Sequence, residues 1–190
     1  MPGLPSAKMS ASEYLAWERE QPERHEFYRG EVFAMAGGSL RHSALAASIA
    51  RELGNAALSS DCHVHTSDRR VVVAPGEHYV YPDLTLVCGP HELAEGSRDV
   101  LTNPYVIIEV LSRSTEAYDR GDKWAAYRQI PSLCEYVLVS QTLPRIEIFR
   151  RKGEGWHYEV AEAGQRLNLA GQFELEVDAI YRRIFELPED

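Results

Sequence analysis

A chain of 190 residues with 44% hydrophobic and 26% charged residues has a globular composition, and its length suits one domain over residues 1–190. Twenty Lys and Arg residues against 29 Asp and Glu residues give a net charge of −9, which excludes a protein that binds nucleic acid mainly through a basic surface. An acidic protein still acts on nucleic acid where its carboxylates hold divalent cations.

Targeting and cysteine signals are absent from the sequence. No apolar run approaches the length of a membrane span, and the first ten residues lack the apolar core of a signal peptide. Cys62, Cys88 and Cys134 form no C-x-x-C pair, so we expect neither a disulfide framework nor a cysteine zinc site. These features predict a protein of a reducing compartment, the cytoplasm, with no membrane partner.

The first third of the chain predicts a helix, a hairpin and a second helix. The S-x-x-E spacing at Ser10 is that of a capping box, so the first helix is expected to begin near Ser10 and end before Pro22. Residues 25–36 predict a short hairpin that turns at an Arg-Gly pair. Ser39 is the expected N-cap of a helix that runs to about Leu58 with apolar residues at helical spacing.

The remainder is dominated by short runs rich in Val, Ile, Tyr and Thr, which predict strands. These runs are residues 63–66, 69–74, 79–87, 104–111, 134–140, 144–151 and 155–161. A helix is expected from Thr115 to Ile130, and a last helix from about Val177 to Glu186. The order predicts an α/β or α+β fold, with a mixed central sheet flanked by helices and additional antiparallel hairpin strands.

Two of the predicted strands carry a carboxylate where an apolar residue would be less costly to bury. Asp83 follows Pro82 within residues 79–87, and Glu109 lies in the apolar run VIIEVL. A buried ionised carboxylate costs several kcal/mol unless a cation or hydrogen bonds compensate for it. Adjacent strands would bring the two acids to one cleft, where Mg²⁺ could be bound by one or two carboxylates and waters.

The helix after Glu109 supplies a candidate cation. Asp119, Lys123 and Tyr127 are spaced i, i+4, i+8 and therefore share one face. Lys123 could reach back to the carboxylates and hold a phosphate or polarise a water. The alternative is an ordinary surface ion pair of Lys123 with Asp119, while Tyr127 is expected to pack with its hydroxyl bonded.

A strand-borne Pro-Asp, a strand-borne glutamate and then a lysine together resemble the PD-(D/E)XK restriction-endonuclease-like superfamily. The ordered motifs are similar to those of its bacterial Uma two family of endonucleases, over about residues 10–185. These motifs are HEFYRGEVFAMAGG with RH following, YPDLTLV, VIIEVLSRST, YDRGDKWAAY and CEYVLVS.

This resemblance implies a restriction-endonuclease-like fold and a Mg²⁺- or Mn²⁺-dependent endonuclease that cuts DNA to leave a 5′-phosphate and a 3′-hydroxyl. Asp83 and Glu109 match the metal-binding acids, Glu26 the early glutamate and Lys123 the lysine of the helix after the EVLS strand, which must take the catalytic role of the superfamily lysine if that role is present. The sequence departs from the superfamily pattern at Leu111, which stands where the lysine usually follows the glutamate. DNA is the expected partner, and a homodimer is compatible with the family.

Two other functions remain open at this point. Leu111 and the −9 charge also suit a binding or regulatory module that has kept the fold and lost the chemistry. The same acids would equally serve a metal-dependent hydrolase of a small phosphorylated substrate.

Three further features are candidates for minor roles. His42 is a candidate general base at the start of its helix. His63 and His65 point the same way on a strand and could bind Zn²⁺ or Ni²⁺, although no third ligand is evident. The basic residues at 145 and 150–152 are either a solvated face or a contact for the DNA backbone.

Overall fold

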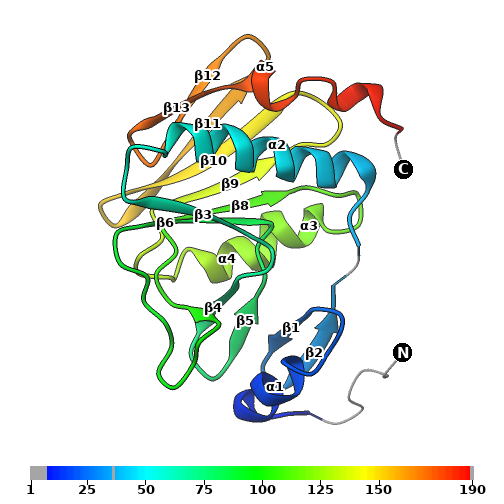
Figure 1. Ribbon diagram of the computed structural model, residues 1–190, viewed down its shortest axis with the longest axis vertical. Coiled ribbons are helices and arrows are strands. Elements are labelled where there is room, and N and C mark those ends of the chain that lie inside the picture. Colours follow the sequence, from blue (N-terminus) through cyan, green and yellow to red (C-terminus); the bar gives the residue numbers. More distant parts are fainter. Residues whose placement is uncertain (1–7, 36, 189–190) are drawn as a thin grey trace.

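The computed structural model describes residues 8–35 and 37–188, which form helices and three β-sheets (Figure 1). The helical elements are α1 (Ala11–Glu18), α2 (Leu40–Ala56), α3 (Glu116–Tyr118), the π-helical turn η1 (Asp119–Lys123), α4 (Trp124–Tyr127), α5 (Val177–Ile180) and the 3₁₀ turn η2 (Ile184–Glu186). The strands are β1 (His25–Tyr28), β2 (Glu31–Ala34), β3 (Cys62–Thr66), β4 (Arg70–Ala74), β5 (His78–Val80), β6 (Leu84–Cys88), β7 (Val100–Leu101), β8 (Val106–Val110), β9 (Glu135–Val139), β10 (Arg145–Lys152), β11 (Gly155–Glu162), β12 (Arg166–Leu169) and β13 (Phe173–Glu176).

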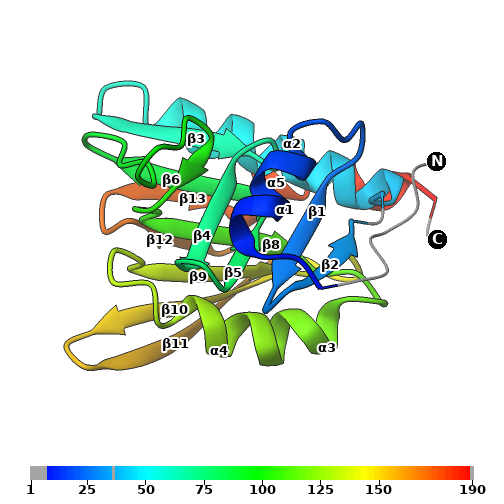
Figure 2. The ribbon, with the colours of Figure 1, turned by 90° about the horizontal axis from the view of Figure 1, so that it is seen from below.

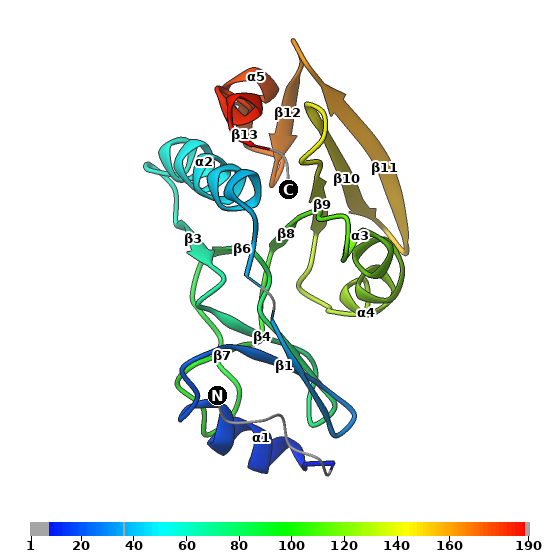
Figure 3. The same ribbon diagram turned by 90° about the vertical axis from the view of Figure 1, so that its right-hand side faces the viewer.

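The central sheet has the strand order β11-β10-β9-β8-β6-β3. It is mixed, because β8 and β9 run parallel and the other neighbours run antiparallel. Helix α2, the β12–β13 hairpin and α5 pack on one face through an apolar cluster, and α3, η1 and α4 lie on the other face (Figures 1 and 3). The predicted mixed sheet flanked by helices, with added hairpin strands, is confirmed.

A second sheet, β2-β1-β5-β4-β7, packs under the first and is covered by α1 (Figure 2). The run 79–87, predicted as one strand, is divided between the two sheets as β5 and β6. Pro82 lies at the division, where a missing backbone N–H ends strand pairing at no further cost. Asp83 therefore stands at the crossover between the sheets.

The helices follow the sequence patterns at their starts and differ at their ends. Ser10 forms a capping box with Glu13, and Ser39 caps α2. The helix predicted to reach Ile130 ends its regular part at Tyr127 and contains the π-turn, while the last helix is reduced to two short turns. The β12–β13 hairpin was not predicted. None of the helices in the described residues is long and apolar enough to span a bilayer.

The expectation that the cysteines stay unpaired is wrong. Cys62 and Cys88 lie opposite each other on the antiparallel strands β3 and β6 and form a disulfide bond, and Cys134 is free. The strand register places them together, which a separation of 26 residues in the sequence did not reveal. The cysteine pattern consequently gives no support for a reducing compartment.

Two buried polar networks fix the elements that carry the site. Below β1, Glu18 accepts hydrogen bonds from the backbone N–H of His25 (2.9 Å) and from the Tyr81 hydroxyl (3.0 Å). On the other side, Arg120 of η1 donates two hydrogen bonds of 2.8 Å to the Glu147 carboxylate on β10. This bidentate ion pair holds η1, the turn that also carries Lys123, against the central sheet.

Replacing Glu147 with Gln should lower the free energy of unfolding at pH 7 by about 2 kcal/mol, since charged hydrogen bonds contribute about 1.5–3 kcal/mol each. The hydrogen bonds from Arg120 lower the pKa of Glu147 from 4.5 to about 2 in the folded protein. A depressed carboxyl pKa stabilises the fold above the unfolded-state value, and this contribution is lost as pH falls from 4.5 to 2.

In chemical denaturation across that pH range, the free energy of unfolding should therefore fall less steeply with decreasing pH for Glu147→Gln than for the unaltered protein. Glu186→Gln is the control, because Glu186 forms an exposed pair with Arg183. Equal stability of Glu147→Gln and the unaltered protein at pH 7 would contradict the structural role of the ion pair.

Candidate active site

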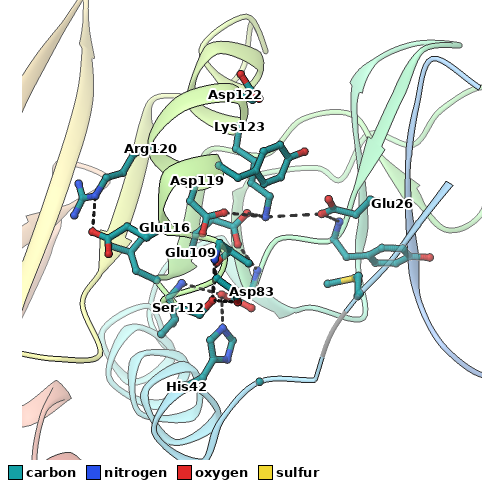
Figure 4. Close-up of a pocket in the computed structure, with 18 of the residues that line it drawn as sticks. Glu26, His42, Asp83, Glu109, Ser112, Glu116, Asp119, Arg120, Asp122 and Lys123 are labelled. Atoms are coloured by element: carbon teal, nitrogen blue, oxygen red, sulfur yellow. Dashed lines mark hydrogen bonds and ion pairs between the residues drawn. The ribbon is translucent and has the colours of Figure 1, made fainter. Parts of the chain in front are cut away.

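An open groove of about 1800 Å³ contains all four residues singled out in the sequence as catalytic. Its sides are the β1–β2 hairpin, the N-terminal end of α2, the α3–η1 segment and the base of the β10–β11 hairpin. Figure 4 shows Glu26, Asp83, Glu109 and Lys123 converging on its floor from β1, the β5–β6 connection, β8 and η1. Glu26 and Glu109 are 83 positions apart in the sequence, and the two sheets bring them together.

Asp83 and Glu109 are held side by side where β6 begins and β8 ends. Leu84 pairs with Ile108 in the antiparallel register, which puts the two acids on neighbouring strands. The backbone N–H of Val110 donates to Asp83 Oδ2 at 2.8 Å, and the backbone N–H of Asp83 approaches Glu109 Oε2 at 3.4 Å. Each acid is thereby oriented by the backbone next to the other.

Lys123 is the cation of the floor. Its Nζ lies 3.0 Å from Glu109 Oε1, 3.3 Å from Asp119 Oδ1 and 3.8 Å from Glu26 Oε1. The expectation that Lys123 turns inward to the carboxylates agrees with this geometry, and its pairing with Asp119 is a buried contact and not a surface one. The π-turn at residues 119–123 places the amine here, and π-turns are frequent at functional sites.

Carboxyl groups outnumber ammonium groups in the floor. Burial raises the pKa of Glu109 to about 8 and also raises the pKa of Glu26, while the Lys123 ammonium opposes both shifts. Burial opposes the charged form of Lys123, but the three neighbouring carboxylates hold its pKa well above the ordinary value. One ammonium group thus faces several buried carboxylates, and the site favours a further cation or a proton.

Glu26 enters the floor from β1. Its carboxylate points to Lys123, and its Oε1 lies 3.5 Å from the backbone N of Tyr81 (Figure 4). Glu26 thus joins the floor through Lys123, and repulsion between the two carboxylates makes it one of the groups that raise the pKa of Glu109.

Three groups around these acids were underestimated from the sequence. His42 Nε2 lies 3.1 Å from Asp83 Oδ2, and this contact raises the pKa of His42 although burial lowers it. Asp119 is a fourth buried carboxylate, and the Tyr127 hydroxyl donates to Glu109 Oε1 at 2.8 Å. The i, i+4, i+8 spacing was the signal for Asp119 and Tyr127. The position of His42 in the first turn of α2 gave no indication that its side chain would contact Asp83.

Leu111 is buried in the apolar cluster that also contains Tyr127 of α4. The position two residues after Glu109 therefore supplies no ammonium group, and the ammonium beside the acids belongs to Lys123 of η1. Two acids and one ammonium group therefore lie together in the groove although the lysine does not stand two residues after the glutamate in the sequence.

The residues fit a hard divalent cation such as Mg²⁺ or Mn²⁺. Asp83 and Glu109 provide adjacent oxygen donors in a floor where carboxyl groups outnumber ammonium groups, which is the donor chemistry that Mg²⁺ prefers. Across residues 8–35 and 37–188, no three His, Cys, Asp or Glu side chains form a preformed metal cage. A cage is not required, because Mg²⁺ keeps several waters and binds through one or two carboxylates and substrate phosphate.

The remaining sequence candidates lie outside the groove floor. His65 and His91 share a hydrogen bond of 2.7 Å, with the His63 ring beside His91. Arg150 pairs with Glu135 and Glu159. Arg151 donates to backbone carbonyls, so most of the basic cluster serves the fold.

Comparisons with known proteins agree with this geometry. A family model described as "Uma2: Putative restriction endonuclease" matches residues 11–179. In Synechocystis sp. (strain ATCC 27184 / PCC 6803 / Kazusa), "Uncharacterized protein slr1290" is 37% identical over 183 residues, which are 95% of this chain and 95% of that protein. From the same strain, "Uncharacterized protein sll1609" is 34% identical over 146 residues, which are 77% of this chain and 82% of that protein.

The fold is also found in a solved structure from Anabaena variabilis ATCC 29413, described as "a putative nuclease belonging to DUF820". The TM-score is 0.73 at 15% sequence identity, with 93% of this chain and 99% of that chain covered. At this identity the likeness shows a shared, nuclease-like fold.

Replacing Asp83 with Asn should remove the response to divalent cations while leaving the fold intact. The amide oxygen still accepts from the Val110 N–H, but the charge that attracts the cation is lost. Calorimetry should show the unaltered protein stabilised by Mn²⁺, by about 2.7 kcal/mol at 100 times the dissociation constant. Asp122→Asn is the matched control, because Asp122 is an exposed carboxylate of η1 that also lines the groove. An undiminished Mn²⁺ response in Asp83→Asn would exclude Asp83 as a ligand.

Proposed function

This chain belongs to the Uma2 family, as its motifs predicted, and we propose that it is a Mg²⁺-dependent endonuclease that hydrolyses phosphodiester bonds in DNA. The observation that carries the proposal is the buried Lys123 ammonium 3.0 Å from Glu109, on a floor that also holds Asp83. Two acids and one ammonium are the groups needed to bind a cation and to stabilise charge on a phosphate.

The groove admits a phosphodiester only with help from cations. Its lining includes eight carboxylates and six Lys or Arg side chains, so a polyanion entering it meets net repulsion. Bound divalent cations reverse the local sign of the charge. This requirement supports metal dependence and explains how a chain with a net charge of −9 can act on DNA.

Asp83 and Glu109 would hold the cation, because they are the adjacent oxygen donors of the floor. Mg²⁺, when bound there, would neutralise charge on the phosphate and lower the pKa of water. Hydrogen bonds from Val110 to Asp83 and from Tyr127 to Glu109 fix the two carboxylates beforehand, so little reorganisation accompanies substrate binding.

Lys123 supplies the positive charge that the transition state needs. Glu109, Asp119 and Glu26 keep its amine protonated and pointed into the groove. The ammonium can hold the attacking water or the phosphate oxygen on which charge develops. A bond forms between the water oxygen and phosphorus as the water loses a proton, and the bond from phosphorus to the 3′ oxygen breaks as that oxygen takes up a proton. The products are then a 5′-phosphate and a 3′-hydroxyl.

The rival function is a binding module without chemistry, which Leu111 suggested. The position of Lys123 weakens that alternative, because an amine is present beside the acids without the usual spacing. The two functions differ in turnover, so a cleavage assay separates them.

The direct test is cleavage of supercoiled plasmid and of single-stranded circular DNA in Mg²⁺ or Mn²⁺. Glu109→Gln should fold correctly and cut on the order of 100-fold more slowly or not at all, by analogy with the loss of one preorganised catalytic group. Chelation of the metal should stop the reaction, and ligation of the products should reveal 5′-phosphate ends.

Lys123→Met provides the matched comparison, because it removes the ammonium without removing either acid, and circular dichroism establishes that the variant is folded. Its cleavage rate should fall by a larger factor than its affinity for Mn²⁺. If Glu109→Gln cuts at the unaltered rate, the activity comes from elsewhere or from a contaminant. If no preparation cuts either DNA, the binding module is the better account.

A further inference from the structure

Exposed aromatic side chains gather in the groove. The described part of the chain has five aromatic residues that are at least 40% exposed, and four of these line the groove: Tyr28 (44%), Phe33 (48%), Tyr118 (40%) and Tyr158 (47%). Exposed aromatic rings cost free energy in water, and their concentration around one cleft is typical of a surface that binds a ligand.

The first pair belongs to the face of the β1–β2 hairpin that carries Glu26. Glu26 and Phe33 are direct cross-strand partners, so their side chains lie on the same face. Tyr28 is two residues after Glu26 on the same strand and shares that face as well. Glu26 points to Lys123 (Figure 4), so the face that it shares with both rings is the one that looks over the groove floor.

The opposite side of the groove carries Tyr118. The Lys123 amine, which contacts Glu109, lies 5.7 Å from the centre of the Tyr118 ring. The Tyr158 ring stands further along this side, and its hydroxyl donates to Glu147 at 2.8 Å. Aromatic faces thus flank the acid–lysine floor on both sides.

We propose that the groove takes unpaired, single-stranded DNA, with the bases next to the scissile phosphate stacked on Phe33 and Tyr28 on one side and on Tyr118 on the other. This inference rests on the proposed nuclease function and adds its substrate class. Aromatic rings bind unpaired bases without regard to sequence, because every base has a π-face. Within a duplex the bases are stacked on each other and turn only edges and phosphates outward, so these rings would find no partner.

Charge favours the same substrate. A single strand carries its phosphates at lower density than a duplex and condenses fewer counterions per phosphate. A groove lined by more carboxylates than cations therefore repels a single strand less than a duplex. The Arg29 guanidinium, 5.3 Å from the centre of the Tyr28 ring, adds a cationic group beside one stacking surface. A protein partner would also cover aromatic rings, but the rings flank the acids, where a nucleotide must lie for cleavage.

The test compares one DNA sequence of roughly 30 nucleotides as a single strand, as a duplex and as a duplex with a central unpaired bubble. The unaltered protein in Mg²⁺ should cut the single strand and the bubble at least about ten-fold faster than the duplex, in proportion to one or more lost stacking contacts. Binding is measured separately by fluorescence anisotropy of the labelled single strand, in the Glu109→Gln background, where cleavage is slowed and Asp83 is still present to hold a cation.

In that background, Phe33→Ala and Tyr118→Ala should each weaken binding of the single strand by about ten-fold, as expected for one stacked base. Phe33→Trp should retain affinity, because it keeps an aromatic face. Leu58→Ala is the control, since Leu58 is 82% exposed and lies outside the groove.

The outcomes separate the substrate class from the nuclease function. Preferential cutting of unpaired DNA with weaker binding in the alanine variants supports both. Equal or faster duplex cutting, with the alanine variants behaving like Leu58→Ala, overturns the inference and leaves a nuclease. Aromatic-dependent binding without any cleavage supports the single-strand site and overturns the nuclease. Loss of a dimer in Phe33→Ala with unchanged DNA binding overturns the inference in favour of a protein interface.

Discussion

A buried ammonium group surrounded by carboxylates is the interaction on which the arrangement of this site depends. Lys123 offsets part of the negative charge of Glu109, Asp119 and Glu26, and without it these acids would repel each other more strongly in a region that water hardly reaches. The elements that deliver the acids belong to different layers, namely the small sheet, the large sheet and the helix between them. Their packing is therefore compatible with buried charge only when the π-turn places the Lys123 amine among the acids. This is also the position from which the amine could contact a phosphate in the groove.

Much of the fold and the floor could be predicted from local patterns. The glutamate in VIIEVL stood out because nothing in an apolar strand explains a carboxylate, and the i, i+4, i+8 spacing placed Lys123 on a buried face. Patterns within one element did not reveal contacts between elements. The division of the strand at Pro82, the contact of His42 with Asp83 and the Cys62–Cys88 disulfide all depend on strand register and sheet order, which no short window of sequence contains.

The β1–β2 hairpin links the chemistry of the floor to the surface above it. One face of the hairpin packs on α1 through Phe27, and the other bears an acid flanked by aromatic rings. Any movement of this hairpin would shift Glu26 and Phe33 together, because they are paired across the strands. The buried contacts of Glu18 with His25 and Tyr81 oppose such movement and keep both at a fixed distance from the large sheet. Substrate recognition and the charge balance of the site thus share one rigid support.

The central claim is that the floor is a cation site made by Asp83 and Glu109 beside a protonated lysine. Anomalous diffraction from crystals soaked in Mn²⁺ tests it most directly, because it locates the metal without assuming activity. The account predicts a peak within coordination distance of carboxylate oxygens from both acids, with the Lys123 amine still in the floor. An empty floor, or a Mn²⁺ peak only at the His65–His91 pair, would contradict it.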